Sequence, residues 1–186
     1  MKIVFVRHGD CDKSCADERG FIGMGRDMSP MTELGVKQAK VAAENPMLDG
    51  CQLIVSSPYT RALQTAAIVS LRRGLEINVE IDMHEFLPDR TFRVASEEDA
   101  KVYHDEFKIC CGEHPAGETR NWETISELVA RTRRVLDRYL EAGYEKIAVV
   151  GHGGLIRRYT GERVIGYCHV SEIEYTKDFV CFDWVP

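Results

Sequence analysis

The sequence has 186 residues, of which 44% are hydrophobic, and a formal net charge of −6. A net acidic chain lacks the broad positive field that attracts nucleic acid or an anionic membrane surface, so we expect neither as a partner. The length and the hydrophobic content predict a single domain over residues 1–186. No apolar run approaches the ~20 residues of a membrane span and no leader is recognisable, which predicts a cytoplasmic protein.

The first half of the chain alternates between apolar runs and helical patterns. Residues 2–6 (KIVFV) are a short run of β-branched and aromatic residues, which predicts a buried strand. Apolar residues at helical spacing predict a helix over residues 32–44. A second buried strand is predicted at residues 52–56, and the helix predicted over residues 59–73 ends at Gly74.

The second half repeats this alternation with one insertion. A third strand is predicted over residues 77–81. Residues 95–117 form the insertion, and its polar pattern predicts a helix over residues 97–108. A long amphipathic helix over residues 122–141 then leads to a buried strand at residues 146–150.

The alternation of strands and helices predicts an α/β fold, with a mostly parallel sheet covered on both faces. A short helix over residues 155–162 follows the fourth strand, and residues 172–174 and 179–184 predict a C-terminal hairpin. Ligands of such sheets bind beyond the carboxyl ends of the strands. Residues 7–9 (RHG) and 151–153 (GHG) each follow a buried strand, so we expect them to share one crevice.

His8 is the candidate nucleophile. A lone histidine is more often structural than catalytic, but a neutral imidazole attacks phosphorus well and leaves readily once phosphorylated. Arg7 is its neighbour, and Arg61 lies in the first turn of the helix after the second strand. Arginines supply the planar, bidentate donors that a transferring phosphoryl group needs. His152, protonated beside a dianion, would be a further donor.

The seven cysteines are scattered along the chain. Without a secretory signal we interpret them as reduced thiols. The alternative is a zinc site, but the spacing lacks paired CxxC units, so we expect no metal and no cofactor. The residues of that alternative are Cys11, Cys15, Cys110, Cys111 and His114.

Five motifs occur in an order and spacing that chance does not readily produce. They are residues 7–9 (RHG), 30–35 (PMTELG) with Gln38 and Ala39, 56–66 (SSPYTRALQTA), 117–119 (GET) and 151–154 (GHGG). From about residue 2 to residue 160 the chain resembles the histidine phosphatase superfamily, in its phosphoglycerate mutase-like branch. The resemblance implies a three-layer α/β/α sandwich.

The resemblance also implies the roles of the site residues. It places a phosphohistidine on His8 and a phosphate pocket around Arg7, Arg61 and His152. It further implies an acid on the loop after the third strand, where Glu85 is the candidate. A glutamic acid there would protonate the leaving oxygen and then activate water. An exposed loop carboxylate is the alternative interpretation of Glu85. His84 and Asp10 are the fallback acids.

The chain departs from the family pattern at three places. Asp10-Cys11 replaces the usual glutamate and hydroxyl residue, so one phosphate donor is missing. A tryptophan and an asparagine common in relatives are absent near residues 13–15, and Gly151 stands where serine is frequent. These departures affect the details of the pocket rather than its core.

Hydrolysis of a phosphomonoester on a small phosphorylated metabolite is the predicted function. The short, polar insertion provides no water-excluding lid, which disfavours the alternative of phosphoglycerate mutase-type transfer. A non-catalytic phospholigand-binding protein is the second alternative. Cationic residues in and before the insertion are expected to form a specificity wall, and they are Arg90, Arg93, Lys101, His104 and Lys108.

Overall fold

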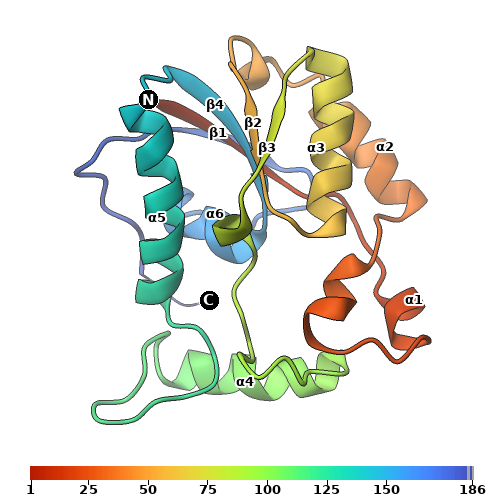
Figure 1. Ribbon diagram of the computed structural model, residues 1–186, viewed down its shortest axis with the longest axis vertical. Helices are drawn as coiled ribbons and strands as arrows, with labels where there is room; N and C mark the ends of the chain where they lie inside the picture. The colour runs from red at the N-terminus through yellow and green to blue at the C-terminus, as the bar shows by residue number, and fades with distance from the viewer. Residues whose placement is uncertain (184, 186) are drawn as a thin grey trace.

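A five-stranded sheet runs through the centre of the computed structural model, which describes residues 1–183 and 185 (Figure 1). The strands are β1 (Lys2–Arg7), β2 (Ile54–Ser56), β3 (Ile77–Val79), β4 (Lys146–Gly151) and β5 (Val170–Glu174). Their order across the sheet is β3-β2-β4-β1-β5. Neighbours among the first four strands run parallel, whereas β5 is antiparallel to β1. The predicted α/β class with a mostly parallel sheet is confirmed.

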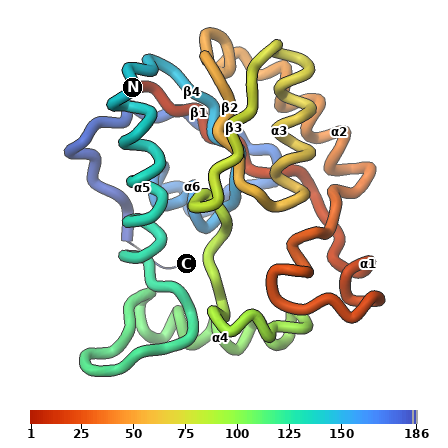
Figure 2. The backbone as a smooth tube through the Cα atoms, in the orientation of Figure 1, coloured from red at the N-terminus to blue at the C-terminus, as the bar shows by residue number. Residues whose placement is uncertain are grey.

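Helices cover both faces of the sheet, with α2 and α3 on one face and α5 and α6 on the other (Figure 1). The helices are α1 (Ser14–Asp17), α2 (Glu33–Ala42), α3 (Thr60–Arg73), α4 (Glu97–Ile109), α5 (Ile125–Glu141) and α6 (Gly153–Thr160). Three 3-10 turns are η1 (Gly23–Met28), η2 (Pro46–Leu48) and η3 (Ile81–Met83). None of these described helices combines the length and the apolar character of a membrane span. Figure 2 shows α1 and α4 at the same end of the molecule, beyond the carboxyl ends of the parallel strands.

The central strands are apolar at successive positions because both of their faces are covered. In β1, Ile3 and Phe5 belong to the core under α5 and α6. Val4 and Val6 belong to the second core, under α2 and α3. All four side chains are fully buried. This packing holds β1 rigidly, so the residues at its carboxyl end have a well-defined position.

The predicted C-terminal hairpin is wrong in its second strand. Residues 179–183 form no strand, and Trp184 lies outside the described residues. The strand β5 pairs instead with β1, whose second edge is open to it. Phe179 packs against the core under α5 and α6, with its ring stacked 5.9 Å from that of Tyr159. Side-chain packing, rather than a ladder of hydrogen bonds, therefore holds this segment.

The sequence predicted no helix or strand within residues 14–28. The structure has the short α1 and η1 there. The buried Arg26 joins them, because its Nε donates to Asp17 Oδ1 over 2.7 Å. Its Nη2 also donates to Glu97 Oε1, over 3.2 Å. These ion pairs connect the N-terminal segment to the start of α4.

Candidate active site

The two glycine-flanked histidines lie side by side at the carboxyl ends of β1 and β4. Arg7 is opposite Gly151 in the parallel register, so the residues that follow each of them are neighbours. The ring centroids of His8 and His152 are 5.1 Å apart. His8 is 5% exposed and His152 is fully buried. The two triplets therefore meet in one crevice, as the sequence predicted.

Arg61 bridges the two imidazoles from the first turn of α3. Its Nε lies 3.3 Å from His8 Nε2, and its Nη2 lies 3.4 Å from His152 Nδ1. A guanidinium can only donate, so both ring nitrogens accept and the opposite nitrogens carry the hydrogens, as assigned from this network. His8 Nδ1 then donates to the Gly9 carbonyl over 2.8 Å, and His152 Nε2 donates to Ser57 Oγ over 2.7 Å.

Both imidazoles are held neutral. Burial, followed by the charge of Arg61, lowers the pKa of His8 to about 3. Burial and the charge of Arg61 likewise hold the pKa of His152 well below 6.5. A neutral His8 whose Nε2 carries a lone pair instead of a hydrogen is the form that attacks phosphorus, once that nitrogen gives up its contact with Arg61. In this structure the Nδ1 of His152 accepts from Arg61, and the protonation of His152 beside a dianion stays a prediction.

Acid should destabilise the protein through these buried imidazoles. As the pH falls below about 6.5, the histidines of the unfolded chain take up protons that buried His8 and His152 do not, so the free energy of unfolding decreases. Each such histidine contributes a slope of about 1.4 kcal/mol per pH unit until its folded-state pKa is reached. Urea unfolding of wild type and His152→Gln at pH 7 and pH 5.5 measures this. The variant should lose less stability on acidification, and an identical loss in both proteins would contradict the prediction.

Arg7 lies at the same crevice with one buried donor unpaired. Its Nη1 donates to the Ile165 carbonyl over 2.5 Å, and its guanidinium lies 4.3 Å from the centre of the Tyr167 ring. The Nε of Arg7 is buried and has no hydrogen-bond partner among the described residues. Leaving a buried donor unpaired costs about 1–3 kcal/mol, which an oxygen of a bound anion would offset.

Glu85 reaches the crevice from the loop after η3. Its Oε1 accepts from the Phe86 amide over 2.9 Å, and its Oε2 accepts from the Gly154 amide over 3.0 Å. Gly154 lies in the first turn of α6, where an added Cβ would be 2.5 Å from Glu85 Oε1. The close approach of the carboxylate therefore requires glycine at this position.

The two fallback acids lie elsewhere. His84 is buried, and its Nδ1 lies 2.7 Å from the Glu85 carbonyl oxygen. Asp10 accepts a hydrogen bond from Thr32 Oγ1 over 2.6 Å. Neither residue lines the cavity that His8 and Glu85 share. Glu85 is thus the acid candidate with access to a ligand.

A cavity of about 660 Å³ opens in front of His8, which leaves room for an organic group as well as a phosphate. Arg7, His8, Arg61 and Glu85 line it, whereas the fully buried His152 lies behind Arg61. The remaining walls come from Phe86, Tyr167, the segment around α1 and residues of α4, α5 and α6. Their aromatic members include His104 and Phe107, and their charged members are Asp12, Lys13, Asp17, Glu97, Lys108, Arg157 and Arg158.

The predicted specificity wall is only partly correct. His104 and Lys108 line the cavity, whereas Arg90, Arg93 and Lys101 do not. Arg90 instead forms an ion pair with Glu127 on α5, which draws it away from the cavity. Three rings form one part of this wall, where the Phe86 ring lies 4.6 Å from that of Phe107 and 5.4 Å from that of His104.

Sequence reasoning missed two partners of the site. Asp27, in η1, accepts from Arg61 Nη1 over 2.8 Å, and no local pattern marks this residue. Ser57 holds His152, and its position directly after β2 was the available signal. In residues 1–183 and 185, no group of three or more His, Cys, Asp or Glu could hold a metal ion.

Comparison with known proteins identifies the family. The sequence profile described as the histidine phosphatase superfamily (branch 1) matches residues 3–178. The chain belongs to this superfamily. A protein of Photorhabdus laumondii named "Probable phosphoglycerate mutase GpmB" is 28% identical over 159 residues, which cover 82% of this chain and 70% of that protein.

The fold of this histidine phosphatase also occurs in a solved structure. A mycobacterial glucosyl-3-phosphoglycerate phosphatase, in complex with VO3, superposes with a TM-score of 0.71. The match covers 96% of this chain and 93% of the other, at 22% sequence identity. At this identity the match supports the fold, and the site rests on the geometry described above.

Proposed function

We propose that this histidine phosphatase hydrolyses the phosphomonoester of a small phosphorylated metabolite through a phosphohistidine on His8. One observation carries the proposal: Arg61 donates to both His8 Nε2 and His152 Nδ1 at the inner end of a ligand-sized cavity. A phosphoryl group seated there would replace the two neutral imidazole acceptors of Arg61 with anionic oxygens, which a guanidinium binds more strongly. The unpaired Nε of Arg7 would become satisfied at the same time.

In the first step, the lone pair of His8 Nε2 attacks phosphorus and the ester P–O bond breaks. Glu85, in its protonated form, would give its proton to the leaving oxygen, so that an alcohol rather than an alkoxide departs. The hydrogen bond from His8 Nδ1 to the Gly9 carbonyl stabilises the positive charge that the ring acquires. Arg7 and Arg61 neutralise the equatorial oxygens, and the dianion would favour a proton on His152.

In the second step, the carboxylate of Glu85 takes a proton from water as the water oxygen attacks phosphorus. The P–N bond breaks and its electron pair returns to His8 Nε2. Phosphate then leaves. Glu85 is protonated again and ready for the next turnover. The carboxylate lines the same cavity as His8, which such a shuttle requires.

An acid-labile phosphoenzyme tests the proposal. Denaturing quench during turnover should trap phosphate on His8, and turnover in water labelled with 18O should give phosphate that carries the label. A mutase would instead return the phosphoryl group to an alcohol, and phosphate would form slowly or not at all. A phospholigand-binding protein would show no trapped phosphate. Label found only in the alcohol would exclude attack at phosphorus.

The domain organisation and the compartment follow from the same proposal. The whole chain would act as one domain, with residues 95–117 contributing to specificity through the cavity wall of α4. The rings of Phe86, His104 and Phe107 favour a planar group on the substrate, next to the charged side chains that line the same cavity. All seven cysteines are free thiols, which supports the cytoplasm as the compartment in which the protein acts.

A further inference from the structure

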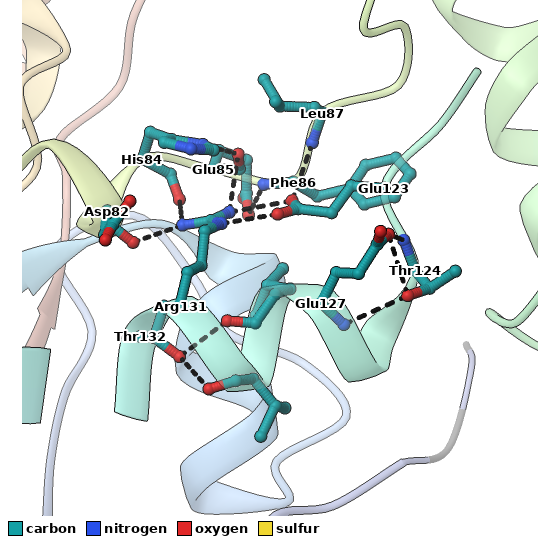
Figure 3. A network of polar contacts seen from close by, with 12 residues as sticks. Asp82, His84, Glu85, Phe86, Leu87, Glu123, Thr124, Glu127, Arg131 and Thr132 are labelled. Atoms are coloured by element: carbon teal, nitrogen blue, oxygen red, sulfur yellow. Dashed lines mark hydrogen bonds and ion pairs between the residues drawn. The ribbon is translucent and has the colours of Figure 1, made fainter. Parts of the chain in front are cut away.

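The loop that carries Glu85 is held by a buried ion pair from outside the site. Figure 3 shows Arg131 of α5 reaching the main chain of residues 82–87, with Glu123 beside it. Arg131 is 6% exposed and Glu123 is 4% exposed. Neither residue lines the cavity. Both are therefore placed to act on the loop and not on a ligand.

Arg131 uses each of its five N–H groups. Its Nε and Nη2 donate to the two carboxylate oxygens of Glu123, over 2.6 Å and 2.9 Å. Its Nη1 donates to the carbonyls of Asp82 and His84, and its Nη2 donates to the carbonyl of Glu85 over 3.2 Å. A guanidinium is the only side chain with enough fixed donors for this pattern.

Glu123 completes the hold on the other side of the loop. Its Oε2 accepts from the Leu87 amide over 3.2 Å, and its own amide donates to the Leu87 carbonyl over 2.9 Å. The main chain is thus bound just before, at and just after Glu85. The carboxylate of Glu85 is then fixed separately by the amides of Phe86 and Gly154.

Burying two charges is costly, and a buried ion pair is a poor source of net stability. Its value lies in the single geometry that it imposes. General acid catalysis demands such a geometry, because misplacement of a catalytic group by about 1 Å can cost roughly 100-fold in rate. Three of the five bonds of Arg131 go to the loop that carries Glu85, and the other two go to Glu123, which itself binds that loop at Leu87.

We propose that Arg131, oriented by Glu123, is a positioning residue for the proton transfer of Glu85. This inference rests on the proposed role of Glu85 as the acid. Arg131 acts through the backbone of residues 82–87, so its loss should mimic loss of the acid and leave attack by His8 intact. A residue that merely stabilised the fold would slow all substrates together.

The experiment compares two leaving groups in Arg131→Lys, Glu85→Gln and the double variant. An alkyl phosphate such as β-glycerophosphate needs a proton on its leaving oxygen, whereas p-nitrophenyl phosphate hardly does. Arg131→Lys should lower kcat/KM for the alkyl phosphate by about 10- to 100-fold and for the aryl phosphate by less than about 3-fold. In the Glu85→Gln background, Arg131→Lys should add little, because both changes remove one function.

The control is Arg138→Lys, on the same helix, whose exposed guanidinium pairs with Glu80 and which should not change either rate. Equal slowing of both substrates by Arg131→Lys, or fully additive losses in the double variant, overturns the inference. If Glu85→Gln itself slows both substrates equally, the acid role fails, and the inference falls with it. Should Arg131→Lys not fold, Glu123→Gln is judged by the same two criteria.

Discussion

Replacing His8 by alanine is expected to lower kcat/KM for p-nitrophenyl phosphate by roughly 10⁴-fold, because the reaction loses its nucleophile. His8 Nε2 is the ring nitrogen that faces Arg61 at the inner end of the cavity. The pKa of His8 is about 3, so the wild-type ring is fully in its attacking form at pH 7. The residual rate would come from the arginines and Glu85, which this substitution leaves in place.

The assay is run without added metal, and folding of the variant is checked by its melting temperature. His169→Ala is a matched control, since this imidazole is partly exposed and pairs with Glu162 outside the cavity. We expect the control to retain wild-type turnover. Turnover by His8→Ala equal to wild type would remove the enzymatic interpretation altogether.

Arg61→Lys is expected to lower kcat/KM by about 10²- to 10³-fold although the charge is kept. The guanidinium of Arg61 donates hydrogen bonds to His8, to His152 and to the carboxylate of Asp27 at the same time. A lysine ammonium is a point charge on a flexible stem and lacks the planar fork for this geometry. The loss should appear mainly as weaker binding of the transition state.

Orthovanadate inhibition provides a second measurement, because vanadate mimics the transferring group. Arg61→Lys should weaken inhibition by a factor similar to the loss in kcat/KM. Arg72→Lys is the matched control on the same helix, where the exposed Arg72 pairs with Glu44. A loss below about 3-fold for Arg61→Lys would place this side chain outside the reaction.

Most helices of this protein could be predicted because their start and stop signals are local. Thr32 caps α2 by accepting from the Gly35 amide, and Thr124 forms a capping box with Glu127 at the start of α5. Gly74 ends α3 in the left-handed conformation, at a φ of 67°. Each signal spans only a few residues, so a single sequence contains it.

The misplaced C-terminal strand has a different origin. Apolar residues at positions 179–182 fit a strand as well as they fit a core contact, and the choice depends on which partner is free. The open edge of β1 accepts β5, and Phe179 finds the rings of Tyr159 and Tyr175. Pairing is a property of the assembled sheet, which no local pattern records.

The sequence by itself determined the alternation of strands and helices. It also determined which residues follow the carboxyl ends of β1 and β4. Apolar runs covered on both faces must be interior strands, and the carboxyl ends of neighbouring parallel strands meet at one edge. From this alone His8 and His152 could be expected to be neighbours. Their family pattern then suggested phosphoryl transfer.

Only the tertiary structure decided three features. These are the tautomers of His8 and His152, the residues of the cavity wall, and the contacts that fix the loop of Glu85. Arg61 finds Asp27 across 34 positions of sequence, and Arg131 reaches the carbonyls of Asp82 and His84 across 49 and 47. Such contacts form when packed elements bring distant polar groups into the same dry interior, where a donor without an acceptor is costly. That requirement acts on the folded chain as a whole.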